Sequence, residues 1–183
     1  MFEEALVRHC SPTLAGLKTG SMFVFRCDDP DRIAFLTEEY NVRLSERGVR
    51  MIILRKRDHS ALVYVYRPDM LKADLCDRMS SEILMEEGYD CFDPEFCLHR
   101  LRTRLSEGDR FPHEVGLFLG YPPEDVRGFI QHQGACCKCS GCWKVYGDAE
   151  KTKKCFERFR KCRRIYYHQW AMGKTVESLT VPA

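Results

Sequence analysis

The chain has 183 residues, of which 44% are hydrophobic and 31% are charged, and its formal net charge is +2. This length and composition fit a single soluble domain, residues 1–183, with a core of its own. The longest uncharged apolar run, Ala61 to Tyr66, is far too short to cross a bilayer, which excludes a transmembrane protein. The first ten residues carry acids where a secretory signal needs bases, so we expect a cytoplasmic protein with reduced thiols and no membrane partner.

Residues 1–67 are predicted to be the strand-rich part of the chain. Three short β-branched or aromatic runs predict strands at 21–27, 49–57 and 61–68. The last two strands are separated by a short polar turn and should form a hairpin. Before them, Asp29 followed by Pro30 is a typical helix start, and apolar residues at helical spacing continue until Gly48.

Residues 68–133 are predicted to be helical. Apolar residues at helical spacing run from Leu71 to Ile83, and Asp93 followed by Pro94 begins a further helix. Two shorter helices are predicted at 113–120 and 123–133.

Residues 134–148 are predicted to be a cysteine-rich loop that ends in a short strand at 143–146, and residues 149–173 a long helix. Cys155 and Cys162 lie on the apolar stripe of that helix, about 10.5 Å apart along its axis, so at most one of them could join a metal site. The predicted architecture is α/β or α+β, with a small three- to four-stranded sheet and about six helices.

The long helix is strongly basic, because segment 151–164 holds eight Lys or Arg residues and one acid. Lys153, Arg160, Lys161 and Arg164 fall away from the apolar stripe. Such a face fits an acidic protein or a nucleic acid, and it is also what an ordinary solvated helix presents. A nucleic-acid-binding protein is therefore one of the functional alternatives.

Three passages stand out by their motif-like composition: "HCSPTLAGLKTGSMF", "FPHEVGLFLGYPPEDVRGFI" and "WKVYGD". In this order they resemble an uncharacterised family of anaerobic Gram-positive bacteria, domain of unknown function 3793. The resemblance implies no known activity, but it singles out residues of each motif: Cys10, Pro12, Thr13, Gly16 and Lys18 in the first, His113, Glu114, Gly120, Tyr121, Pro122, Asp125 and Gly128 in the second, and Gly141, Trp143, Lys144, Val145 and Tyr146 in the third. The dense cysteines beside the third motif depart from the family pattern.

Cys136, Cys139 and Cys142 have the C-x-x-C-x-x-C spacing with which bacterial ferredoxins hold an iron–sulfur cluster. Zinc would need a fourth ligand, for which His132 is a candidate, and the second cysteine pair usual in structural zinc sites is missing. A redox pair and a loop without chemistry are the other interpretations. The favoured hypothesis is a metal- or thiol-linked accessory or binding protein, with zinc or an iron–sulfur cluster as the candidate cofactor.

The competing hypothesis is an enzyme. Cys10 would be a thiol nucleophile with His113 as its base, Glu114 would orient the imidazole, and Lys18 or Lys144 would bind an anion. The pair His113-Glu114 does not extend into the H-E-x-x-H motif of zinc proteases.

The second motif also has the spacing of a DNA-binding helix-turn-helix. Its second helix would present Glu124 and Asp125 to the duplex, and these acids would repel the phosphates. We therefore interpret the motif as an αα-hairpin.

Overall fold

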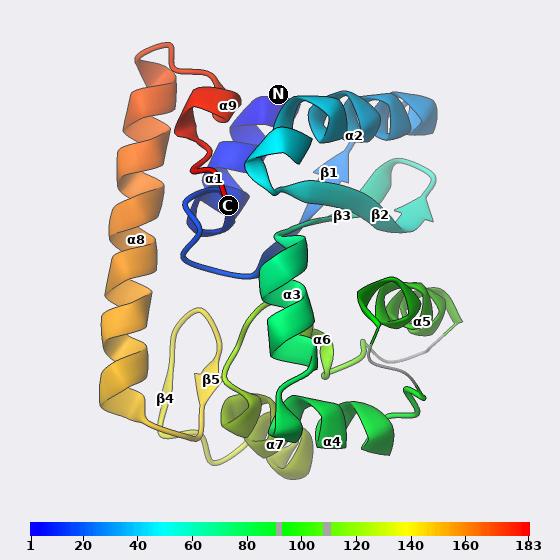
Figure 1. The fold of residues 1–183 in the computed structure, drawn as a ribbon, viewed down its shortest axis with the longest axis vertical. Helices are drawn as coiled ribbons and strands as arrows, with labels where there is room; N and C mark the ends of the chain where they lie inside the picture. Colours follow the sequence, from blue (N-terminus) through cyan, green and yellow to red (C-terminus); the bar gives the residue numbers. More distant parts are fainter. Residues whose placement is uncertain (91–92, 108–110) are drawn as a thin grey trace. The chain divides into compact units, whose positions relative to one another are not determined.

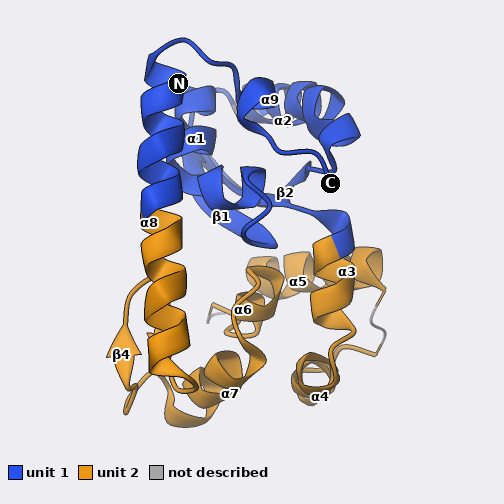
Figure 2. Cartoon of the chain, turned by 60° about the vertical axis from the view of Figure 1, so that its left-hand side comes forward, with its two compact units in different colours: residues 1–69, 161–183 blue, residues 70–160 orange. Residues whose placement is uncertain are grey.

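The computed structural model describes residues 1–90, 93–107 and 111–183 (Figure 1). The chain divides into two compact units, of which unit 1 is residues 1–69 with 161–183 and unit 2 is residues 70–160 (Figure 2). The fold class is α+β, as predicted. None of the helices in the described ranges is both long and apolar enough to cross a membrane.

Unit 1 is built on a three-stranded antiparallel sheet in the order β1-β3-β2. The strands are β1 (Gly20–Arg26), β2 (Arg50–Arg57) and β3 (Ser60–Tyr66). Tyr66 at the end of the central strand is opposite both Gly20 and Arg50, and the register of β2 then shifts at a bulge between Ile53 and Arg55. Successive side chains of a strand point to opposite faces, so the unbroken buried run from Ala61 to Val65 means that both faces of β3 are covered. All three predicted strands and the hairpin are confirmed.

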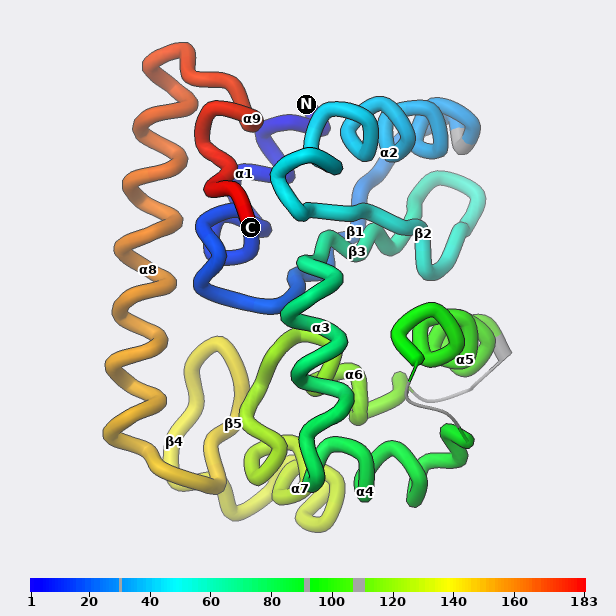
Figure 3. Tube along the Cα trace, in the orientation of Figure 1, coloured from blue at the N-terminus to red at the C-terminus, as the bar shows by residue number. Residues whose placement is uncertain are grey.

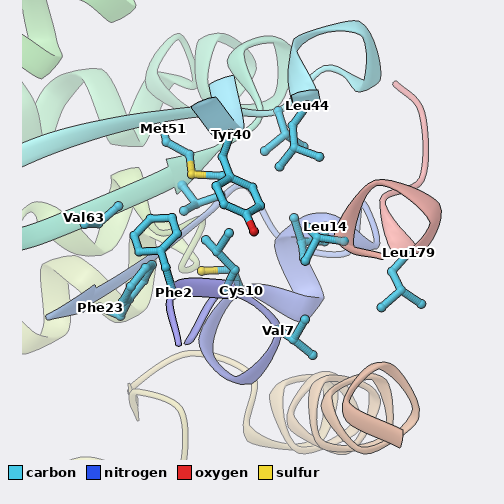
Figure 4. Packing of buried hydrophobic residues seen from close by; sticks show 14 of the residues in the cluster. Phe2, Val7, Cys10, Leu14, Phe23, Tyr40, Leu44, Met51, Val63 and Leu179 are labelled. Carbon is cyan, nitrogen blue, oxygen red and sulfur yellow. The ribbon is translucent and has the colours of Figure 1, made fainter. Parts of the chain in front are cut away.

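Two helices cover one face of this sheet: α1 (Phe2–Leu14) and α2 (Pro30–Leu44). The core cluster joins Phe23, Met51 and Val63 of the three strands to apolar side chains of both helices (Figure 4). The predicted cap of α2 is confirmed, since the Asp29 carboxylate accepts the backbone N–H groups of residues 31 and 32. A 3-10 turn, η1 (Ser45–Arg47), follows α2.

Helix α1 was not predicted from the sequence. Leu6, Cys10 and Leu14 recur at every fourth position and are all buried, which is a regular helical signal. Pro12 inside the helix obscures this signal, because proline is usually confined to the first turn.

A buried arginine, Arg67, joins the C-terminal segment of unit 1 to the end of α1. Arg67 donates from Nε to the Thr13 carbonyl at 2.7 Å and from Nη2 to the carbonyls of Leu14 at 2.8 Å and Val181 at 2.6 Å. Burial lowers the pKa of Arg67, but these three carbonyls and that of Arg47, at 3.5 Å from Nη1, accept four of its five N–H donors. The short helix α9 (Val176–Leu179) precedes this contact.

Unit 2 is mainly helical. Its elements, some reaching into unit 1, are α3 (Pro68–Leu75), α4 (Arg78–Glu86), α5 (Pro94–Glu107), α6 (Val115–Phe118), α7 (Pro123–His132), β4 (Cys139–Ser140), β5 (Lys144–Val145) and α8 (Ala149–Ala171). Figure 3 follows the chain from α6 through α7 and the β4–β5 hairpin into α8.

Two details of unit 2 differ from the sequence prediction. The helix predicted from Leu71 to Ile83 is two helices, because the Asp77 carboxylate accepts the N–H groups of Met79 and Ser80 and so caps a new helix, α4. The strand predicted at 143–146 exists as β5, but it pairs with β4 inside the cysteine run and not with the main sheet. The described residues form nine α-helices, against about six predicted, the additional ones being α1, α9 and the separate α4.

Candidate functional site

Asp125 in the first turn of α7 holds the second and third motifs together. Its carboxylate is 1% exposed and accepts three N–H donors, each at 2.7 Å: the Trp143 indole and the backbone amides of Tyr146 and Gly147. A buried carboxylate is costly unless donors of this kind replace its hydration. The β4–β5 hairpin is therefore fixed to α7 by one acidic side chain.

The Trp143 ring lies in an aromatic cluster. It stacks on Tyr121 with 4.5 Å between ring centroids and meets the edge of Phe156 of α8 at 4.6 Å. Offset and edge-on contacts of this kind stabilise a site beyond the area that they bury. Phe156 was not singled out from the sequence, although its position next to Cys155 and one turn before Phe159 places it on the apolar side of α8.

Two motif glycines are required by close approach. A Cβ on Gly128 would lie 2.4 Å from Cγ of Tyr146, and a Cβ on Gly141 would lie 2.3 Å from Cε2 of Phe156. Both distances are shorter than real Cβ contacts allow. The Tyr146 and Phe156 side chains thus occupy the space that a Cβ at Gly128 or Gly141 would need.

A pocket of about 340 Å³ lies between α6, α7 and the β4–β5 hairpin. We call it the aromatic pocket, and it is lined by Phe111, His113, Val115, Gly116, Leu119, Tyr121, Asp125, Val126, Phe129, Ser140, Cys142, Trp143 and Lys144. The pocket therefore brings together His113 from the second motif and Lys144 from the third. Phe129 also belongs to its wall and was missed by the sequence analysis.

The polar groups of the aromatic pocket are arranged around Phe129. The Lys144 ammonium lies 5.9 Å from the centre of the Phe129 ring and donates to the Gly134 carbonyl at 2.6 Å. The His113 ring meets Phe129 edge-on at 4.9 Å between centroids. A cation, an imidazole and the Cys142 thiol thus share one largely apolar cavity.

A second pocket of about 510 Å³ in unit 2 also uses Tyr121 and Trp143 as wall residues. Its polar lining is mainly acidic and includes Asp77 and Asp148, whose carboxylates cap α4 and α8. Cys155 of α8 lies in the same wall.

Glu114 is adjacent to His113 in sequence but belongs to a different environment. Its side chain is 0% exposed, accepts the Tyr89 hydroxyl at 3.0 Å and forms an ion pair with Arg104, with 2.7 Å between Oε1 and Nε. Its second oxygen is buried without a hydrogen-bond partner, and burial raises the pKa of Glu114. The orienting role predicted for Glu114 has no contact here that supports it.

Cys10 lies in the core of unit 1, whereas His113 belongs to unit 2. Figure 4 shows Cys10 among Phe2, Val7 and Tyr40, and its side chain is 0% exposed. Burial raises the pKa of the Cys10 thiol to about 12, a shift that the nearby Lys18 only partly offsets. These surroundings favour the neutral thiol, which is a weak nucleophile.

The cysteines of the loop occupy separate positions. Cys136 is exposed with a left-handed backbone, φ +58°, Cys139 lies in β4, and Cys142 lies in the turn that follows. Over residues 1–90, 93–107 and 111–183, no group of three His, Cys, Asp or Glu side chains is placed to hold a metal ion. His132, the candidate fourth ligand, stacks on Tyr146 with 5.6 Å between ring centroids.

Thr13, Tyr146 and Cys162, which the sequence also singled out, each have local partners or are buried. Thr13 exchanges a hydrogen bond with Ser21 at 2.9 Å between side-chain oxygens, inside unit 1. Tyr146 donates its hydroxyl to the Ala135 carbonyl at 2.9 Å, which closes the loop around the hairpin. Cys162 is buried, and burial raises the pKa of its thiol to about 11.

The fold and the aromatic pocket together define an α+β protein in which two sequence motifs build one small-molecule-sized cavity. The chain matches the family described as "Protein of unknown function (DUF3793)" over residues 6–180, and it therefore belongs to this family, as the three motifs predicted. No curated protein and no solved structure matches it.

Proposed function

We propose that this protein is a ligand-binding accessory protein, and that the aromatic pocket of unit 2 holds a small molecule with an aromatic or apolar body and one anionic group. One observation supports this proposal most: His113 and Lys144, from two separate motifs, line the same pocket of about 340 Å³. Small-molecule sites commonly have about 300–1,000 Å³, mainly apolar walls and a few convergent polar groups.

The walls suit a flat apolar body. Phe111, Leu119 and Phe129 contribute apolar surface, and the Trp143 and Tyr121 rings contribute flat faces. Burial of an aromatic group against such walls is favourable through the hydrophobic effect and through ring contacts.

The charge of the pocket suits an anionic group. The Lys144 ammonium has three N–H donors, and its bond to the Gly134 carbonyl uses one of them. Asp125 also lines the pocket, but its carboxylate accepts three N–H groups and is 1% exposed. An incoming carboxylate would therefore meet Lys144 and His113 as donors and little opposing charge.

The thiol-linked part of the hypothesis rests on Cys142, which lines the same pocket. Because the loop thiols are not gathered into one ligand set in the described residues, the arrangement supports a bound organic molecule better than a metal ion held by Cys136, Cys139 and Cys142.

The test uses Trp143 as an internal reporter. Trp170→Phe leaves Trp143 as the sole tryptophan, since the chain has two. This variant is titrated with phenylacetate, with neutral phenylacetamide and with cationic phenethylamine, and the Trp143 emission is followed. We expect saturable quenching that is strongest for phenylacetate, with roughly fivefold or greater preference over the amide because a charged hydrogen bond contributes about 1.5–3 kcal/mol.

A matched pair of lysine variants locates the charge. Lys144→Met should abolish the preference for phenylacetate over phenylacetamide. Lys138→Met is the control, since Lys138 also donates to a backbone carbonyl, Gly147 at 2.7 Å, but lies outside the pocket lining. Quenching that does not saturate with any of the three probes, or an equal effect of both lysine variants, would refute the proposal.

A further inference from the structure

The part of α8 that belongs to unit 2 carries an exposed basic surface. Thr152, Phe156 and Phe159 bury one side of this helix. The bases between residues 151 and 160 are all exposed, and we call them the basic face of α8: Lys151, Lys153, Lys154, Arg158 and Arg160. Lys161 and Arg164, on the next turns of the same helix, are exposed as well.

Acidic side chains form few ion pairs with the basic face, although Lys151 borders the second pocket, whose polar lining is mainly acidic. Among the described residues, the pair of Lys153 with Glu150 at 2.9 Å is the one ion pair within 4 Å that a member of the face makes. Two arginines elsewhere in unit 2 are paired, Arg104 with Glu87 and Arg127 with Glu82. The basic face therefore places four bases without an ion pair within 4 Å on one stretch of helix, among the described residues.

The spacing of the bases gives the surface its shape. At about 100° and 1.5 Å per residue, Lys151, Lys154 and Arg158 follow one edge of the exposed side over about 10.5 Å. Lys153 and Arg160 follow the other edge, roughly 140° away, and Glu157 and Lys161 lie between the two edges. The helix therefore presents two rows of positive charge with one acid and one base between them.

We propose that the basic face of α8 binds the phosphate backbone of double-stranded nucleic acid without reading its sequence. A helix about 10–12 Å across fits a major groove about 12 Å wide, and the two rows would then meet the phosphates on the two walls. Successive phosphates of one strand are farther apart along the groove wall than their rise of about 3.4 Å along the duplex axis, so a row of about 10.5 Å reaches roughly two of them. Glu157 and Lys161 point between the rows with opposite charges, so the net positive charge lies in the two rows that face the phosphates, and this is why the contact is to the backbone.

The test measures binding of the full chain to two unrelated, fluorescently labelled 20-base-pair duplexes by anisotropy between 50 and 200 mM salt. Lys154→Glu with Arg158→Glu removes one row. Lys56→Glu with Arg57→Glu, two exposed bases at the end of β2, changes the net charge by the same amount and is the matched control. Circular dichroism confirms that both variants are folded.

We expect both duplexes to bind equally, with an affinity that falls steeply as salt rises. The α8 variant should lose about tenfold or more in affinity at 50 mM salt, and its slope of log K against log salt should be shallower by about 2, one for each lost phosphate contact. The control variant should change affinity less than about threefold. Absence of binding at 50 mM salt, equal losses in both variants, a preference for one duplex, or tighter binding of polyglutamate than of either duplex would overturn the proposal, the last result pointing to an acidic protein.

Discussion

Trp143 donates its indole N–H to the Asp125 carboxylate at 2.7 Å, and this bond joins the third sequence motif to the second. The same carboxylate accepts the amides of Tyr146 and Gly147, so the hairpin strand β5 continues into a turn that Asp125 holds. The walls of the aromatic pocket come from both motifs. The geometry of the pocket therefore depends on Asp125 even though this residue has no role as a ligand donor.

Asp125→Ala should lower the free energy of unfolding by about 3–5 kcal/mol, because it leaves three N–H donors without their acceptor inside unit 2. Urea denaturation followed by circular dichroism measures this loss. Asp29→Ala is the comparison, since Asp29 accepts two amides as an exposed helix cap and its loss should cost about 1 kcal/mol. Equal costs for the two variants would mean that Asp125 is not a buried anchor.

Gly128→Ala should destabilise the protein by about 1–3 kcal/mol, because the new Cβ would overlap the Tyr146 side chain. The sign of the change is informative: in the interior of a helix such as α7, alanine is better than glycine by about 1 kcal/mol when space is available. Thermal and urea unfolding report the sign. A stabilised variant would show that α7 and Tyr146 are not in close contact.

We expect the Arg43–Glu177 ion pair to contribute to the free energy of unfolding at neutral pH and to lose this contribution in acid. Burial is the largest single influence and opposes ionisation of Glu177, but the hydrogen bonds from Arg43, from Thr175 and from its own backbone, with the charge of Arg43, together lower the pKa of this carboxyl. Because the folded-state pKa is below the unfolded one, the contribution is present at neutral pH and fades as the pH falls through about 4. Glu177→Gln should therefore cost up to about 1 kcal/mol at pH 7 and progressively less below pH 4. A difference in the free energy of unfolding between wild type and variant that stays constant over pH 3–7 would contradict this expectation.

For Glu114 we expect stability to change with pH in the opposite direction. Burial raises its pKa, so the folded protein holds the proton more tightly than the unfolded chain, and the stability that this gives declines as the pH rises through the folded-state pKa. Glu114→Gln imitates the protonated side chain. Relative to the wild type, we expect this variant to gain stability between pH 4 and pH 8 in parallel unfolding series. A relative loss over that interval would show that pairing with Arg104 dominates the burial.

Local patterns predicted those parts of the fold whose causes are local. The strands of the main sheet are β-branched and aromatic, and Asp29-Pro30 marks the start of α2, so each was recognisable from neighbouring residues. Strand β4 consists of Cys139 and Ser140, which have no marked strand preference, and it forms only because residues 144 and 145 lie opposite. Strand β4 therefore forms through pairing with β5 across the turn, and not through a local sequence preference.

The site was predictable in its residues but not in its arrangement. The motif resemblance singled out His113, Asp125, Trp143 and Lys144, and the structure brings all four to one pocket. Sequence spacing says nothing of distance in space, so the pairing of Cys10 with His113 stays a prediction. Burial of Cys10 in the core of unit 1 is a tertiary property that depends on α1, which the sequence analysis did not predict.

The central claim is that the aromatic pocket binds an aromatic anion through Lys144. Its most direct test is the affinity ratio of phenylacetate to phenylacetamide, measured by Trp143 emission in the Trp170→Phe background with and without Lys144→Met. We predict a ratio of roughly five or more that falls to about one when Lys144 is replaced. A ratio near one in the parent protein, or one that survives the replacement of Lys144, would contradict the claim.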